Sequence, residues 1–125
     1  MIHHVSVGTN DLAKSRVFYD AVLPVIGVQL MQSSPRAADY GSGVLMFSVE
    51  TPVNGQPASS GNGSHIAFAA EDRAMVDQFY AAALANGGTS DGAPGLRPEY
   101  DAHYYGAFVR DPDGNKVEAV TYAAK

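Results

Sequence analysis

The chain has 125 residues, a length typical of one domain with its own hydrophobic core. Its formal net charge is −5 at pH 7, and its 8 Lys and Arg residues form no cluster, which argues against a nucleic-acid partner or an anionic membrane surface. There is no cysteine, which excludes disulfides and thiolate catalysis, and neither a signal peptide nor a membrane span is apparent, so we expect a cytoplasmic protein.

The first part of the chain predicts a strand, a helix and three further strands. Residues 2–7 (IHHVSV) are β-branched and alternate in polarity, which favours a strand. Asp11 offers a capping oxygen to a helix expected over about residues 11–23, and Pro24 and Gly27 end that helix. Further strands are expected near residues 25–32, 37–40 and 44–50.

The second part of the chain begins after a segment rich in Gly, Pro, Ser and Asn, residues 51–63, which we interpret as a linker. A strand over residues 64–70 and a helix over about residues 72–84 follow. The Gly- and Pro-rich residues 89–98 are predicted as a loop that could cover a pocket. A hairpin of two strands closes the chain, at residues 104–110 and 116–122.

These two parts repeat each other with an offset of 61 residues. The matched pairs are His4 and His65, Phe18 and Phe79, Tyr19 and Tyr80, and Gly27 and Gly88. We therefore predict an α+β fold of two tandem βαβββ modules, in which a curled mixed sheet surrounds a central cavity and the helices pack outside. We expect a single domain, residues 1–125, with module one at about 1–50, the linker at 51–63 and module two at about 64–123.

Three side chains are expected to converge on this cavity. Apolar neighbours on each strand should cover the helices, so His4, His65 and Glu118 point the other way. Two imidazoles and one carboxylate form a facial triad that suits one divalent ion of Fe, Mn, Ni, Co or Zn. A buried carboxylate without a partner is costly, and an ion pair between Glu118 and a protonated histidine would satisfy it without metal.

Other candidate groups lie near the same cavity. Aligned at an offset of 72 residues, Glu118 corresponds to Met46, which we interpret as a pocket wall rather than a fourth ligand. One member of the Tyr104–Tyr105 pair should face inward by alternation, as a proton donor or as an aromatic wall. Further candidates are Ser6 beside the first histidine, His103 as a base at the pocket mouth, and Arg97 or Arg110 as a clamp for a substrate carboxylate.

The segments around these residues resemble the vicinal oxygen chelate superfamily of glyoxalases, bleomycin-resistance proteins and type I extradiol dioxygenases. The similarity lies in residues 4–7 (HVSV), in the Asp11 to Tyr19 helix, in residues 63–67 (GSHIA) and in residues 108–118 (FVRDPDGNKVE). It covers essentially the whole chain. The resemblance implies paired βαβββ modules, a divalent metal, a small-molecule substrate and a homodimer.

Individual branches of that superfamily fit this sequence unequally. Glyoxalase I enzymes carry a fourth ligand where this chain has Met46, and extradiol dioxygenases carry a tyrosine where it has Phe108. We therefore favour a metal-dependent lyase, isomerase or transferase acting on a small oxygen-chelating substrate. The alternatives are a bleomycin-resistance-like binding protein without turnover, an extradiol-type dioxygenase, and a dimeric scaffold that has lost its activity.

Overall fold

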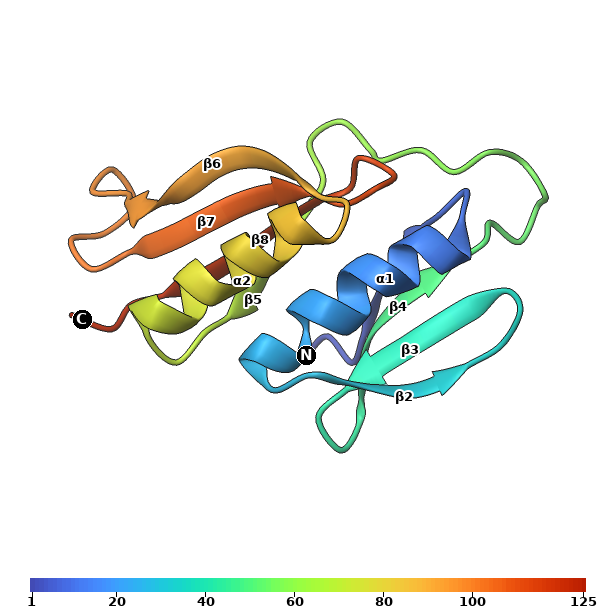
Figure 1. The fold of residues 1–125 in the computed structure, drawn as a ribbon, viewed down its shortest axis with the longest axis horizontal. Helices are drawn as coiled ribbons and strands as arrows, with labels where there is room; N and C mark the ends of the chain where they lie inside the picture. Colours follow the sequence, from blue (N-terminus) through green and yellow to red (C-terminus); the bar gives the residue numbers. More distant parts are fainter.

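The computed structural model describes all 125 residues as two βαβββ units joined by a linker that contains neither helix nor strand (Figure 1). The first unit consists of β1 (Val5–Gly8), α1 (Leu12–Val22), the short 3-10 helix η1 (Pro24–Ile26), β2 (Gln29–Ser33), β3 (Ala37–Gly41) and β4 (Leu45–Glu50). The second consists of β5 (His65–Ala69), α2 (Arg73–Ala85), β6 (Thr89–Leu96), β7 (Tyr105–Arg110) and β8 (Lys116–Thr121). The predicted α+β class and the two tandem modules are confirmed.

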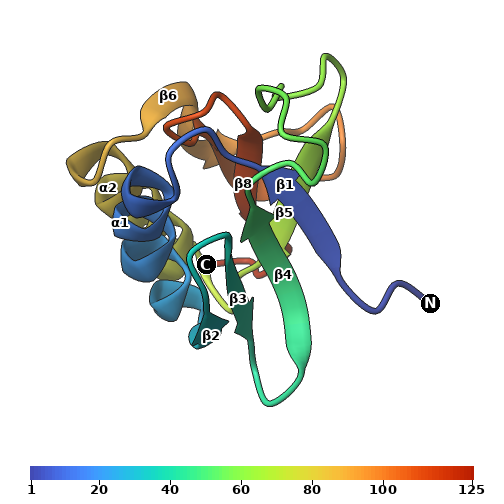
Figure 2. The ribbon, with the colours of Figure 1, turned by 90° about the vertical axis from the view of Figure 1, so that its right-hand side faces the viewer.

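Each unit forms one four-stranded mixed sheet, in the order β1-β4-β3-β2 and β5-β8-β7-β6. The first and last strands of each unit pair in parallel, and the other pairs are antiparallel. Both helices lie side by side against one face of the strands, as Figure 2 shows, and the opposite face is left without a helix. The chain by itself does not close the two sheets into a barrel. None of the helices is long and apolar enough to span a membrane.

Both long helices begin where an aspartate supplies the cap. The Asp11 carboxylate accepts a hydrogen bond from the Lys14 backbone N–H at 3.1 Å, and Asp72 accepts one from Met75 at 2.8 Å. A carboxylate at this position also interacts favourably with the positive end of the helix dipole. The predicted helices are therefore confirmed to within about one residue at each end, a normal margin for helix termini.

One continuous core of 17 buried apolar residues spans the two units. The rings of Phe47 in β4 and Phe68 in β5 pack edge to face at 5.5 Å between centroids, which joins the two sheets on their helix side. Gly88 lies so close to Phe18 that a Cβ atom there would come within 2.6 Å of the ring. The matched glycine of the repeat thus allows close packing between the two units.

Residues 89–98 differ from the sequence prediction, because most of them form the edge strand β6 rather than a loop. The strand is irregular, with register shifts around Gly92, whose φ of 152° suits only glycine. Pro94 is tolerated because an edge strand has backbone groups that need no partner strand. The strand expected over residues 25–32 is also shorter than predicted, since η1 precedes β2.

Strand pairing also corrects the internal alignment of the repeat. Ala67 in β5 pairs with Glu118, and its counterpart Ser6 in β1 pairs with Ser48. The residue of unit one that corresponds to Glu118 is therefore Ser48, not Met46. The sequence comparison missed this because the turns between strands differ in length, and only the pairing with β1 and β5 fixes the register.

A buried hydrogen-bond network fastens unit one to the turn Asp111–Asn115 of unit two. The Tyr19 hydroxyl, fully buried in α1, donates to Asp111 Oδ2 at 2.6 Å. The Asn115 side-chain amide donates to the same oxygen and to the Gly8 carbonyl at the end of β1. The Thr9 hydroxyl donates to Asp113 at 2.6 Å. Because these polar groups satisfy one another, the interface between the units is specific as well as apolar.

We expect Tyr19→Phe to lower the free energy of unfolding by about 1–2 kcal/mol, because Asp111 loses a buried donor. Tyr80→Phe is the matched control, since the Tyr80 hydroxyl donates to Ser90 on the exposed surface and occupies the repeat-equivalent position. Urea unfolding followed by circular dichroism measures both variants. Equal losses in the two would contradict a special role for the Tyr19–Asp111 bond.

The same bond should appear in the pH dependence of stability. Burial first, and then the Asp111 carboxylate, raise the pKa of Tyr19 well above its ordinary value of 10.0. The folded protein therefore holds this proton more tightly than the unfolded chain, so its contribution to stability is complete below pH 10 and declines above it. We expect the wild type to lose stability more steeply than Tyr19→Phe above about pH 10, as measured by urea unfolding at a series of pH values.

Candidate functional site

Glu118 is a fully buried carboxylate on the face of β8 that points away from the helices. Its strand neighbours Val117 and Ala119 lie in the hydrophobic core, so alternation directs Glu118 to the other side. His65 Nε2, at the start of β5, lies 3.2 Å from Glu118 Oε1. The Tyr104 hydroxyl donates a hydrogen bond to Oε2. One carboxylate oxygen therefore has an imidazole as its partner and the other has a phenol, and neither oxygen contacts a lysine or arginine.

The backbone of β7 leaves room for this carboxylate. A Cβ atom on Gly106 would lie 2.9 Å from Glu118 Oε2, so only glycine accommodates the side chain without a shift. Tyr104 is held between Tyr100 and Tyr122, with ring centroids 5.0 and 5.3 Å away. Burial first, and then the hydrogen bond to Glu118, raise the pKa of Tyr104, so its phenol is neutral at physiological pH.

A cavity of about 410 Å³ opens over this group. Its lining residues are His65, Tyr100, Tyr104, Phe108, Lys116 and Glu118. The wall is mainly aromatic, and the carboxylate is its only acidic group. Such a mixture of aromatic surface and a few polar groups is typical of a small-molecule site.

His4, the third predicted ligand, does not lie beside His65 and Glu118 in the single chain. It precedes β1, is exposed, and its Nδ1 lies 2.9 Å from Nδ1 of His3. It lines a separate cavity together with Met46 and with residues 66–69 of β5. Accordingly, no three histidine, cysteine or carboxylate side chains of the chain come together as a metal site. Met46 lines this separate cavity and not the one over Glu118.

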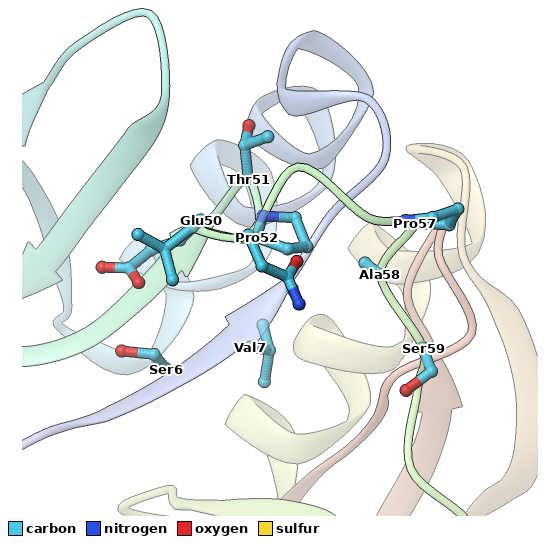
Figure 3. Close-up of a pocket in the computed structure, with 11 residues that line it drawn as sticks. Ser6, Val7, Glu50, Thr51, Pro52, Pro57, Ala58 and Ser59 are labelled. Carbon is cyan, nitrogen blue, oxygen red and sulfur yellow. The ribbon is translucent and has the colours of Figure 1, made fainter.

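Ser6 lies at another cavity, shown in Figure 3, between the ends of β1 and β4 and the linker. Glu50, Pro52 and Pro57 also line this space. Beside it, the Ser48 hydroxyl donates to Asp39 at 2.6 Å and lies 3.3 Å from Glu50. The sequence prediction missed this acidic group. Alternation along residues 44–50 could have indicated it, because Ser48 and Glu50 share the face opposite to the buried Phe47 and Val49.

The remaining candidates have different surroundings. Tyr105 faces the helices, where its hydroxyl donates to Asp77 of α2 at 2.7 Å, so it lies on the wrong face for the cavity. The Arg97 guanidinium lies 5.4 Å from the ring centre of Phe108 and donates to the Ala93 carbonyl. His103 is exposed in the loop before β7, and its backbone N–H donates to Asp101. Of the tyrosine pair, Tyr104 is therefore the inward-facing residue.

His65 and Glu118 fit two positions around a divalent metal ion. Both are ligand types that such ions prefer, they come from adjacent paired strands, and the carboxylate has no cationic side chain as a competitor. Glu118 forms part of the cavity wall, so a ligand in the cavity would lie beside its carboxylate. A catalytic ion needs at least one further protein donor, and the single chain supplies none at this point.

Comparison with known proteins identifies the family. The sequence matches the Glyoxalase/Bleomycin resistance protein/Dioxygenase superfamily over residues 1–119, and the chain belongs to that superfamily. Among solved structures, a glyoxalase/bleomycin resistance protein from Albidiferax ferrireducens T118 is 45% identical with a TM-score of 0.88, over 96% of this chain and 97% of that one.

Two more distant structures share the same fold. A lactoylglutathione lyase from Agrobacterium tumefaciens is 25% identical, with a TM-score of 0.68, over 96% of this chain and 92% of that one. A glyoxalase/bleomycin resistance protein/dioxygenase family enzyme from Burkholderia phytofirmans PsJN is 22% identical, with a TM-score of 0.75, over 97% and 98%. No curated protein matches the sequence. The family is thus established, while its members carry names of several different activities.

The hydrogen bond to Tyr104 should stabilise the buried carboxylate in metal-free protein. We expect Tyr104→Phe to lower the free energy of unfolding by about 1–3 kcal/mol, because Glu118 Oε2 loses its donor. Tyr122→Phe, in the same aromatic cluster but without a hydrogen bond from its hydroxyl, should change it by less than about 0.5 kcal/mol. Chemical unfolding in the presence of a chelator measures both, and similar values for the two variants would contradict the assignment.

Proposed function

We propose that this protein is a glyoxalase-like, metal-dependent enzyme of the lyase, isomerase or transferase type, acting on a small substrate that offers two adjacent oxygens. One divalent ion would be held by His4, His65 and Glu118. The observation that carries this proposal is the buried Glu118 carboxylate, which pairs with an imidazole, lines a cavity and contacts no lysine or arginine. Such a carboxylate is costly in a structural role and well suited to a cation.

The third ligand would come from a second copy of the chain, in a homodimer. His4 directly precedes β1 of the first sheet and is exposed, whereas His65 and Glu118 belong to the second sheet. Both helices cover the same side of the two sheets, so the opposite side of each sheet is free to pack against a second copy. Placing the first sheet of one copy over the second sheet of the other would therefore complete the triad twice in one symmetric dimer.

In this site the side chains of the chain have distinct roles. A bound divalent ion would supply Lewis-acid stabilisation of negative charge that develops on a substrate oxygen. Tyr104 fixes the orientation of Glu118 and keeps its own proton, so it can donate to a substrate oxygen when the carboxylate engages elsewhere. Phe108 and Tyr100 form walls that limit water near the reacting atoms. Because Phe108 has no acidic group, it supplies no proton for an extradiol-type ring cleavage.

A second candidate function is small-molecule binding without turnover, as in a bleomycin-resistance-like protein. The observation that favours it is the aromatic wall formed by Tyr100, Tyr104 and Phe108, which suits a planar ligand whether or not a metal is bound. The 45% identical structure from Albidiferax ferrireducens carries the name glyoxalase/bleomycin resistance protein, which covers both functions. Metal content distinguishes the two candidates.

We expect the untagged wild type, loaded with Ni(II), Mn(II), Zn(II) or anaerobic Fe(II) and then desalted, to retain one divalent ion per chain. Glu118→Gln should remove it, because an amide is a much weaker ligand for these ions than a carboxylate. Glu71→Gln is the matched control, because Glu71 is an exposed acidic residue just before α2 and lies outside the proposed ligand set. Elemental analysis measures all three. No retained ion in the wild type, or equal retention in the two variants, would contradict the metal site.

A mixed dimer tests whether the ligands come from two copies. His4→Ala and Glu118→Gln chains should each lose metal alone. When the two are unfolded together and refolded, each mixed dimer should regain one intact site, made of His4 from one chain with His65 and Glu118 from the other. Elemental analysis of the mixed dimer, isolated with two different affinity tags that are then removed, measures this. Absence of recovery in a folded mixed dimer would show that the ligands do not combine across copies.

A further inference from the structure

A second, fully polar cavity adjoins the aromatic one. It has a volume of about 350 Å³ and no hydrophobic residue in its wall. On one side lies the loop Ser60–Ser64, and on the other lie His65, Arg110 and Lys116. His65 and Lys116 also line the aromatic cavity, so the two spaces meet beside Glu118. The proposed metal site does not use Arg110, Lys116 or the loop.

The three basic side chains stand in one cross-strand row. His65 pairs with Lys116, and Lys116 pairs with Arg110, across three neighbouring strands. Residues directly opposite each other in a sheet point to the same face. The sheet itself therefore holds these groups together at the mouth of the cavity, in a chain whose net charge is −5.

Two cations share one carboxylate at the Arg110 end of this row. Asp91 Oδ2 lies 3.0 Å from Arg110 Nε and 3.7 Å from Lys116 Nζ, while Glu118 contacts the row only at its other end, through His65. Arg110 also donates to the Gly114 carbonyl, which fixes its guanidinium. Lys116 Nζ lies 5.1 Å from the ring centre of Phe108, a contact that positions the ammonium without neutralising it. Both cations remain about one-third exposed, so a ligand can reach them.

The loop on the opposite wall offers further polar groups. Ser60, Asn62 and Ser64 line the cavity, and the backbone takes positive φ at Gly61 (74°) and Gly63 (102°), which requires glycine at both. Ser60 packs against the turn at Gly114, so the loop and the Arg110 end of the row form one structure. The cavity thus combines two cations with hydroxyl and amide groups, the chemistry that proteins use for carboxylate and phosphate oxygens.

We propose that this cavity binds an anionic group, a carboxylate or a phosphate, and that the substrate of the enzyme is therefore a small anion whose remaining part extends over Glu118. The assignment to the substrate rests on the proposed function, whereas binding of the anion does not. An anion in the cavity would leave one end of a ligand beside His65 and the aromatic wall. The row would thereby orient the ligand and select against neutral molecules of similar shape.

Inorganic phosphate and acetate test this in metal-free wild-type protein, separately, by amide NMR titration at low ionic strength. We expect saturable shifts at residues 60–65, 110 and 116 with at least one of the two anions. Phosphate alone would indicate a phosphate group, and acetate alone a carboxylate. Lys116→Met keeps the side-chain stem over Phe108 but removes the charge, so it should raise the dissociation constant of the anion about tenfold. Lys14→Met, an exposed lysine of α1, should leave it unchanged.

Non-saturating shifts with both anions, or equal weakening in Lys116→Met and Lys14→Met, would overturn the proposal. The amide spectrum of each variant shows directly whether that variant is folded. The wild-type titration tests saturable anion binding even if a variant does not fold. The result is separate from the metal experiment. Saturable anion binding by protein that retains no metal would support the anion cavity and reject the metal-dependent enzyme. One metal ion per chain without anion binding would support the metal site and reject the anion cavity.

Discussion

Strand alternation in β8 is the constraint on which the candidate site depends. Val117 and Ala119 must enter the core beneath the helices, and a residue between them has no position other than the opposite face. That residue is an acid, and the strands around it, with Gly106 on one side and His65 on the other, leave it enclosed but reachable from a cavity. The fold therefore maintains a buried carboxylate whose partners are an imidazole and a phenol, an arrangement better suited to cation binding than to stability.

The position of the helices explains why the three proposed metal ligands do not meet in one chain. Both helices cover the same side of the two sheets and share one core, so the side of β8 that carries Glu118 is left without a covering helix. The network around Asp111 fixes this arrangement, because it joins α1 and the end of β1 to the turn between β7 and β8. In the homodimer that we propose, a second copy of the chain would supply another layer over the helix-free side of the sheets.

Much of this could be predicted from residues near one another in sequence. The aspartate caps at Asp11 and Asp72 and the alternation around His65 and Glu118 are local signals, and they gave the helices, most strands and the pairing of His65 with Glu118. The edge strand β6 was missed because Gly92 and Pro94 suggest a loop, whereas backbone pairing with β7 overrides that preference. The match of Glu118 to Met46 failed for a related reason, since register depends on a partner strand far away in sequence.

The sequence by itself determined the family, the repeat and the residue types available for chemistry, because these follow from periodicity and from motifs within short segments. Only the tertiary structure decided which of these residues meet. It brought Tyr104, His65 and Glu118 together, turned Tyr105 to the helices, left His4 on the other sheet, and grouped Arg110 with Lys116 beside a glycine-rich loop. The physical reason is that contacts between strands depend on sheet order and register, and these result from packing of the whole chain.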